Sequence, residues 1–225
     1  MAYQPIEIIS RTRWLPHLSI ICTLIFLVQG AGNAQLPAGR VASHGIERDA
    51  VNADGTGEGV GYFTFIAGVP GPLFAGSPSE ATAFFTFRSD PFSTEVIPNG
   101  TVTALLHPPG RLTIYLNKAP HGNWNNFDTF SEGQPIAVLE FGITQDINDG
   151  SVQIGYTSAR FAASSDFEFQ GQRLNFTNLF PNGVTIAFTT NPRPLNASFP
   201  LIFALGFSSF AIGAETEQTE NVTQK

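Results

Sequence analysis

Short apolar runs alternate with turn residues along most of this chain, at intervals of about ten residues. The runs are rich in Phe, Val, Ile, Thr and Tyr, which suit a pleated, half-buried surface, and Gly, Pro, Asn and Asp separate them. No segment after residue 34 shows a sustained helical period. The pattern therefore predicts an all-β domain, an antiparallel barrel or two-sheet sandwich of about eight or nine strands. The runs are 59–67, 81–88, 101–107, 111–118, 135–147, 151–162, 166–177, 183–190 and 199–212.

The hairpin around Asp149-Gly150 is patterned well enough to predict its register. Asp-Gly favours a two-residue type I′ turn, which places Asn148 opposite Ser151 and separates apolar from polar positions cleanly. The apolar face then holds Leu139, Phe141, Ile143, Ile147, Val152, Ile154 and Tyr156, and the polar face holds Glu140, Thr144, Asp146, Ser151, Gln153 and Thr157. Arg160 is expected on the apolar side, opposite Leu139.

The N-terminus has the three parts of a secretory signal. Arg11 and Arg13 precede an 11-residue apolar run, 18–28, and small residues lead to a cleavage site after Ala34. The run is shorter than the ~20 residues that span a bilayer, although a short membrane anchor or an N-terminal core helix is the alternative. We therefore expect a cleaved signal helix over 1–34 and a secreted, periplasmic or extracellular protein with no membrane span in the mature chain. Cys22, the only cysteine, would leave with the signal, so no disulfide is expected.

The rest of the chain divides into three predicted parts. Residues 35–56 are polar and rich in turn residues, which indicates an N-terminal arm, and 57–214 form a single all-β domain. The apolar segment 199–214 is interpreted as a closing strand, with a membrane-associating segment as the alternative. The polar residues 215–225 are expected to be a disordered tail.

Charge narrows the possible partners. The chain has 225 residues, 11 Lys and Arg against 18 Asp and Glu, and a formal net charge of −7. Nucleic-acid binding depends on basic residues that neutralise phosphates, so a nucleic-acid partner is not expected. The hydrophobic fraction of 42% is enough for a folded core.

No motif indicates a metal, a cofactor or a catalytic centre. Glycines 57–61 open a strand rather than a helix, so they do not form a dinucleotide-binding loop. Residues 146–150 have calcium-like spacing but one residue too few. The histidines His44, His107 and His121 have no His or Cys partner at metal-ligand spacing. We expect no metal and no cofactor, and favour a protein that is not an enzyme, although a triad assembled by the fold stays open.

One loop has side chains suited to a ligand. Residues 121–128 place two aromatic rings among amides, a carboxylate and an imidazole. An aromatic face beside hydrogen-bonding groups is what a sugar ring needs; the alternative is that both rings plug the core while the asparagines serve turns. The candidate ligand-binding residues are His121, Asn123, Trp124, Asn125, Asn126, Phe127 and Asp128, with Arg160 in addition.

Three functions remain open from the sequence. The first is a non-catalytic binding module for a small apolar or carbohydrate ligand, because several Phe-rich strands are apolar on both faces and one face of a barrel can line a cavity. The second is a structural or adhesion protein of the envelope or matrix. The third is a barrel enzyme of cyclase or isomerase type, which an interior group of polar side chains would favour.

Overall fold

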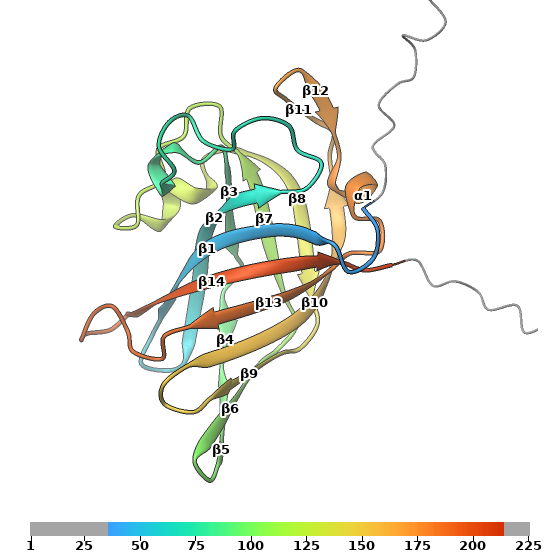
Figure 1. The fold of residues 1–225 in the computed structure, drawn as a ribbon. Helices are drawn as coiled ribbons and strands as arrows, with labels where there is room; N and C mark the ends of the chain where they lie inside the picture. Colours follow the sequence, from blue (N-terminus) through green and yellow to red (C-terminus); the bar gives the residue numbers. More distant parts are fainter. Residues whose placement is uncertain (1–35, 214–225) are drawn as a thin grey trace, which may run out of the picture. The chain divides into compact units, whose positions relative to one another are not determined.

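The computed structural model describes residues 36–213, which form a closed antiparallel barrel of eight strands. The order around the barrel is β13-β14-β1-β2-β3-β7-β8-β10, and β10 pairs with β13 to close it (Figure 1). The strands are β1 (Val41–Val51), β2 (Thr56–Ile66), β3 (Phe85–Ser89), β7 (Gly110–Leu116), β8 (Gln134–Phe141), β10 (Gln153–Ser164), β13 (Val184–Thr190) and β14 (Leu201–Ala211). The all-β prediction is confirmed, and the barrel rather than the sandwich is formed.

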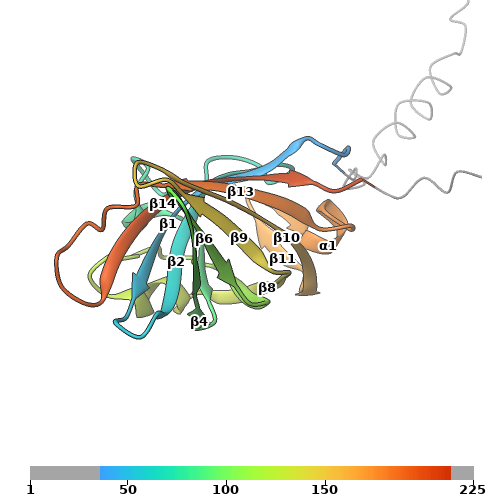
Figure 2. The same ribbon diagram turned by 90° about the horizontal axis from the view of Figure 1, so that it is seen from below.

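Further strands extend the sheet beyond one end of the barrel. β9 pairs with the first residues of β10, and β6 and β5 continue the sheet from there, while the short β4 pairs with β2. Figure 1 shows this extension at the lower end, and Figure 2 shows the same end from below. The added strands are β4 (Phe92–Ser93), β5 (Glu95–Asn99), β6 (Val102–His107) and β9 (Thr144–Asn148).

The chain passes between barrel and extension at two interruptions. Pro108 and Pro109 separate β6 from β7, because proline has no amide hydrogen to donate to a sheet. Gly142 and Ile143 separate β8 from β9. Inward-facing residues are odd-numbered in β8, such as buried Leu139, and even-numbered in β9, such as buried Asp146. The second interruption therefore reverses which side chains face inward.

A small cap lies at the other end of the barrel. It consists of β11 (Phe167–Phe169), β12 (Gln172–Leu174) and the one-turn helix α1 (Phe176–Leu179). The sequence predicts one strand over 166–177, and the structure instead shows a hairpin and a helix. Gln170 and Gly171 form the turn with positive φ, and Asn175 caps the helix by accepting from the amide of Thr177 at 2.9 Å.

The N-terminal segment differs most from its prediction. Residues 41–51 are not an arm but β1, which pairs with β14 on one side and β2 on the other. The segment appears polar because Glu47 and Asp49 occupy inward positions that line a cavity. The predicted closing strand in 199–214 is confirmed as β14.

The Asp149-Gly150 hairpin corrects a second prediction. Asn148 pairs with Gln153, not with Ser151, so the loop is two residues longer than predicted. The Asp149 side chain stabilises this loop by accepting from the amides of Ser151 and Val152. A shift of two residues preserves the faces of a strand, and Ile147 still lies on the same face as Ile154.

The faces of this hairpin are oriented unusually. Ile147 and Ile154 are each 53% exposed, whereas Asp146 on the opposite face is 1% exposed. An alternating strand ordinarily turns its apolar face to the core. Here the polar face lines the inside of the molecule, which indicates that the interior at this end is polar.

Two hydrophobic clusters hold the barrel together. The larger fills the end covered by the cap and includes the fully buried Phe85 and Phe87. The smaller lies outside β2, where Val60 and Tyr62 pack against Ala83 and Phe130. Phe130 belongs to the 3-10 helix Phe127–Ser131, and a second 3-10 turn, Glu80–Thr82, lies in the loop before β3. No helix in the described range is both long and apolar enough to cross a membrane.

The two chain ends lie outside the described residues. The predicted signal segment 1–34, Cys22 and the predicted tail 215–225 belong to them.

Candidate functional site

A cavity of about 450 Å³ occupies the barrel interior and continues onto the inner face of β5, β6 and β9. Its wall is mostly aromatic and aliphatic, from inward positions of the barrel strands. These residues include Phe63, Phe87, Leu112, Ile114, Leu139, Phe161, Ile186, Phe188, Phe203, Leu205 and Phe207. Phe63, Phe87 and Phe207 contact one another edge to face, with ring centroids 5.3–5.8 Å apart.

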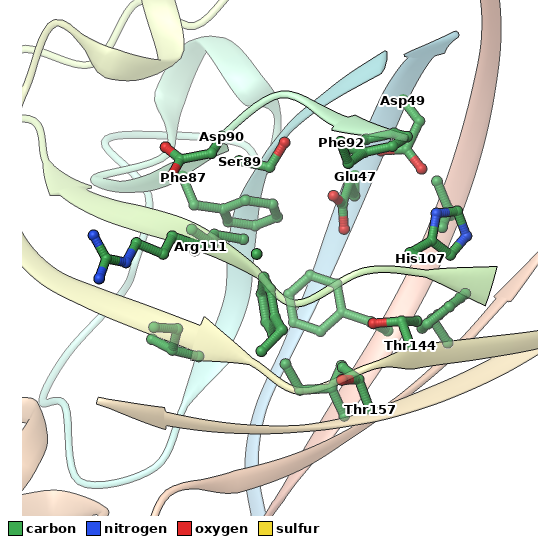
Figure 3. A pocket seen from close by; sticks show the side chains of 18 of the residues that line it. Glu47, Asp49, Phe87, Ser89, Asp90, Phe92, His107, Arg111, Thr144 and Thr157 are labelled. Atoms are coloured by element: carbon green, nitrogen blue, oxygen red, sulfur yellow. The ribbon is translucent and has the colours of Figure 1, made fainter. Parts of the chain in front are cut away.

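Acidic side chains gather at one end of the cavity, the end lined by the added strands β5, β6 and β9. Glu47 and Asp49 enter from β1, Asp146 from β9 and His107 from β6. Figure 3 shows Glu47, Asp49 and His107 around one space, while Arg111 points away from it. The Arg111 guanidinium instead binds Glu140 outside the barrel at 2.6 Å.

Glycine makes room for the carboxyl groups. Asp49 pairs with Gly59 of β2, and a Cβ at Gly59 would overlap Oε1 of Glu47 and Oδ1 of Asp49. Gly155 of β10 pairs with Asp146 of β9, and a Cβ there would overlap Oδ1 of Asp146 and the Phe188 ring. Any larger residue at either glycine would displace a carboxyl group from the cavity end.

Burial shifts the protonation of the β1 carboxyls. Desolvation is the largest cause that raises the pKa of Glu47 well above its usual value, and the neighbouring Asp49 adds to it. Burial likewise raises the pKa of Asp49 to about 7, although a hydrogen bond from Glu47 and the charge of His107 lower it. Both side chains keep some surface facing the cavity, so they are enclosed by protein yet open to a ligand.

Asp146 is held by two hydrogen-bonding partners through one of its oxygens. Gln153 Nε2 donates to Oδ2 at 2.7 Å, and His107 Nε2 lies 3.3 Å from the same atom. His107 Nδ1 lies 3.2 Å from the Thr94 hydroxyl, and its ring meets Phe92 edge to face at 5.6 Å. The segment around β4 thus positions the imidazole.

Two buried carboxylate oxygens at this end have no hydrogen-bond partner among the described residues: Oδ1 of Asp49 and Oδ1 of Asp146. A proton on Glu47 would supply a donor to Asp49. Asp146 has no such neighbour, so its Oδ1 is an acceptor without a donor. Buried acceptors are normally satisfied because leaving one unpaired costs ~1–3 kcal/mol.

The predicted loop 121–128 lies elsewhere, on the outer surface of the barrel. Trp124 packs on Phe130 and Tyr62, with ring centroids 4.8 and 5.8 Å away, and the Arg48 guanidinium lies 4.5 Å above its ring. Phe127 also meets Phe130 edge to face, with ring centroids 6.5 Å apart. None of the loop's residues lines the cavity.

The polar residues of this loop mainly support its own turns. Asn123 accepts from the amide of Asn125, and Asn126 accepts from the amide of Asp128. Asp128 pairs with Arg88 at 2.7 Å, and His121 lies 2.6 Å from Glu132. The loop brings the seven candidate residues together, as the sequence requires, but ligand binding by them stays a prediction.

Arg160 does not join either group. It lies on β10 opposite Glu140, not opposite Leu139 as predicted, and its guanidinium binds Glu140 at 2.9 Å on the exposed face. The longer loop moves the pairing of β10 with β9 by two residues, and the interruption at 142–143 takes one residue back, so β10 pairs with β8 one residue away from the predicted register. Arg111, Glu140 and Arg160 therefore form an external ion-pair ladder.

Sequence reasoning missed the acidic end of the cavity. Glu47, Asp49 and Asp146 come from two strands about a hundred residues apart, and only barrel closure brings them together. One signal was present: the polar face of the 144–157 hairpin held a carboxylate, an amide and a threonine, opposite a face that is apolar.

The fold and site together define a class of protein, a closed eight-stranded barrel with an acidic end to an apolar internal cavity. No family model, curated protein or solved structure matches the chain.

Proposed function

We propose that the protein binds a small, largely apolar molecule inside the barrel. The cavity carries this proposal, because its volume of about 450 Å³ lies in the ~300–1,000 Å³ range of small-molecule sites. An aromatic wall with a few polar groups at one end is also the usual composition of such sites. Eight-stranded barrels are wide enough to hold one small ligand.

A cavity-filling substitution tests this proposal. Thr157 lines the cavity (Figure 3). Its neighbour Ser158 is exposed on the outer face of β10. We expect the parent protein to bind the neutral fluorophore N-phenylnaphthylamine with increased emission. Thr157→Phe should weaken that binding about tenfold or more, and Ser158→Phe should not change it.

Thermal unfolding of both variants is the control for folding. Equal binding by the two folded variants would contradict an internal site. If the parent protein binds no apolar probe, the structural or adhesion role is favoured instead.

A second candidate function is proton-transfer catalysis on an apolar substrate. The observation that favours it is the pair of Glu47 and Asp49, because an Asp49 carboxyl with a pKa of about 7 can both accept and return a proton near neutral pH. Catalysed exchange of the protons beside the carbonyl of an apolar ketone with deuterated water, followed by NMR, would distinguish an isomerase-type enzyme from a binding module.

We also infer that the protein is exported, from the basic start, apolar run and small residues of 1–34. The mature protein should begin at Gln35, open or cyclised, and an intact mass measurement checks this. Because Cys22 would be removed, a reducing agent should leave the melting temperature unchanged. A mass that still includes residues 1–34, or a thiol-dependent melting temperature, would contradict the cleavage.

A further inference from the structure

The acidic end of the cavity has more carboxyl groups than basic groups. Glu47, Asp49 and Asp146 face it, and His107 is the one potentially cationic side chain beside them among the described residues. Arg111, the other basic lining residue, directs its guanidinium outward to Glu140. Buried carboxylates without cationic partners are costly, so an occupant that brings positive charge would be favoured here.

The hydrogen-bonding groups at this end are also unbalanced. Ionised carboxylates only accept hydrogen bonds, and Gln153 and His107 both act on Oδ2 of Asp146, which leaves Oδ1 without a donor. Asp146 lines the cavity but is 1% exposed, so bulk solvent does not supply the missing donor, and an occupant of the cavity would reach Oδ1 once the carboxyl group turns toward it. An ammonium group has three N–H donors and no acceptor.

The surroundings suit an organic cation better than a metal ion. No group of three or more His, Cys, Asp or Glu side chains within 36–213 is placed to hold a metal. Aromatic rings line the same end of the cavity: a Cβ at Gly155 would overlap both the Phe188 ring and Oδ1 of Asp146, and the Phe92 ring meets His107 edge to face at 5.6 Å. Aromatic faces attract organic cations, and the apolar remainder of the cavity would take up a hydrocarbon body.

From this geometry we infer that the ligand is a cationic amphiphile: an amine whose ammonium lies between Asp146, Asp49 and Glu47 and whose apolar part lies among the phenylalanines of the barrel. This inference rests on the proposed function and specifies the ligand class. Burial raises the pKa of Glu47 well above its usual value and the pKa of Asp49 to about 7, so binding of an ammonium below pH 7 should release protons.

The test compares three probes that share a ten-carbon chain: decylamine, decanol and decanoate. Each would displace N-phenylnaphthylamine from the parent protein at pH 7.5, below its micellar concentration. We expect decylamine to bind about tenfold more tightly than decanol, and decanoate more weakly than either. Calorimetry of decylamine binding at pH 6.5, in two buffers of different ionisation enthalpy, should show proton release.

Variants locate the effect. Asp146→Asn should reduce the affinity for decylamine about tenfold and leave decanol unchanged. Asp49→Asn is the second variant, and the same selective loss of decylamine affinity is expected from it if Asp146→Asn does not fold. Glu95→Gln is the matched control, because it removes a carboxyl that is exposed on the same strand extension.

The outcomes separate this inference from the proposed function. If no probe binds the parent protein, the proposed function fails. If decanol binds as tightly as decylamine, the barrel holds apolar ligands and the inference of an amine is overturned. An equal loss of decylamine affinity in Asp146→Asn, Asp49→Asn and Glu95→Gln would also overturn it, since it would reflect only the net negative charge.

Discussion

Raising the pH from 5 to 8 should destabilise the protein by ~2–3 kcal/mol through Asp49, and Glu47 acts in the same direction. Asp49 has a pKa of about 7 in the folded chain and an ordinary value near 4 when unfolded, and the pKa of Glu47 is raised too. The folded state therefore binds more protons than the unfolded state in this range. Stability is then full below the unfolded pKa and is lost as the pH rises through the folded pKa.

The magnitude follows from the same difference. A pKa of about 7 against one near 4 corresponds to about 4 kcal/mol for Asp49 over its whole titration, of which about 2.6 kcal/mol is lost between pH 5 and pH 8. The Asp49 carboxyl is partly open to the cavity and keeps part of its solvation, which explains the lower end of the range. Urea unfolding at pH 5, 6, 7 and 8 measures the loss.

Variants separate these carboxyls from other titrating groups. The double variant Glu47→Gln/Asp49→Asn should lose most of the pH dependence, with stability at pH 8 equal to or above that of the parent. His121, whose pKa is raised by the carbonyl of Ala119 and by Glu132, acts in the same direction and remains in the variant. Glu140→Gln is a control, because Arg111 and Arg160 lower the pKa of Glu140 and confine its contribution to acidic pH. A parent protein with flat stability from pH 5 to 8 would show that both carboxyls are ionised and solvated.

The fold class followed from local pattern because strands and turns are local features. Alternation in runs such as 183–190 and turn residues such as Asn182-Gly183 are specified within a few residues, and both recur as β13 and the turn before it. The cap hairpin was missed for a complementary reason. Phe167, Phe169 and Phe176 are assigned to one predicted strand, although Gln170-Gly171 turns the chain between them, and only the tertiary fold brings all three into the same core.

The site was hidden because its polar residues interrupt the pattern used to find strands. Glu47 and Asp49 make 41–51 appear to be a solvent-exposed arm, although the segment is a central strand of the barrel. In the sequence pattern, Asp146 likewise falls on the polar face of a hairpin, which is normally solvated. A rule that polar faces point outward fails where the interior is a cavity, and such failures are expected at functional sites.

The interruption at 142–143 adds a second obstacle. It reverses the orientation of β9 relative to β8, so Ile147 faces outward while Leu139 faces inward. Nothing in the local sequence indicates the reversal except Gly142, and glycine has several other roles in strands. The inward position of Asp146 therefore depends on the tertiary path of the chain.

Replacing Trp124 by alanine should cost about 3 kcal/mol of folding free energy. Its ring packs on Phe130 and Tyr62 and lies under the Arg48 guanidinium. Truncation of a buried Trp or Phe costs ~3–5 kcal/mol, and Trp124 is half-buried, so the lower end applies. Urea unfolding followed by circular dichroism measures the change. Asn125→Ala, an exposed neighbour in the same loop, should change stability by less than ~0.5 kcal/mol.

The same variant decides between the two interpretations of the 121–128 loop. If the loop were a sugar-binding edge, Trp124 would contribute little to stability, and its fluorescence in the parent protein would respond to a carbohydrate. Because the ring joins an outer cluster with Val60 and Phe130, we expect a large stability loss and no carbohydrate response. A loss below about 1 kcal/mol with a saturable carbohydrate response would place a second ligand site on this outer surface, since the loop lines no part of the barrel cavity.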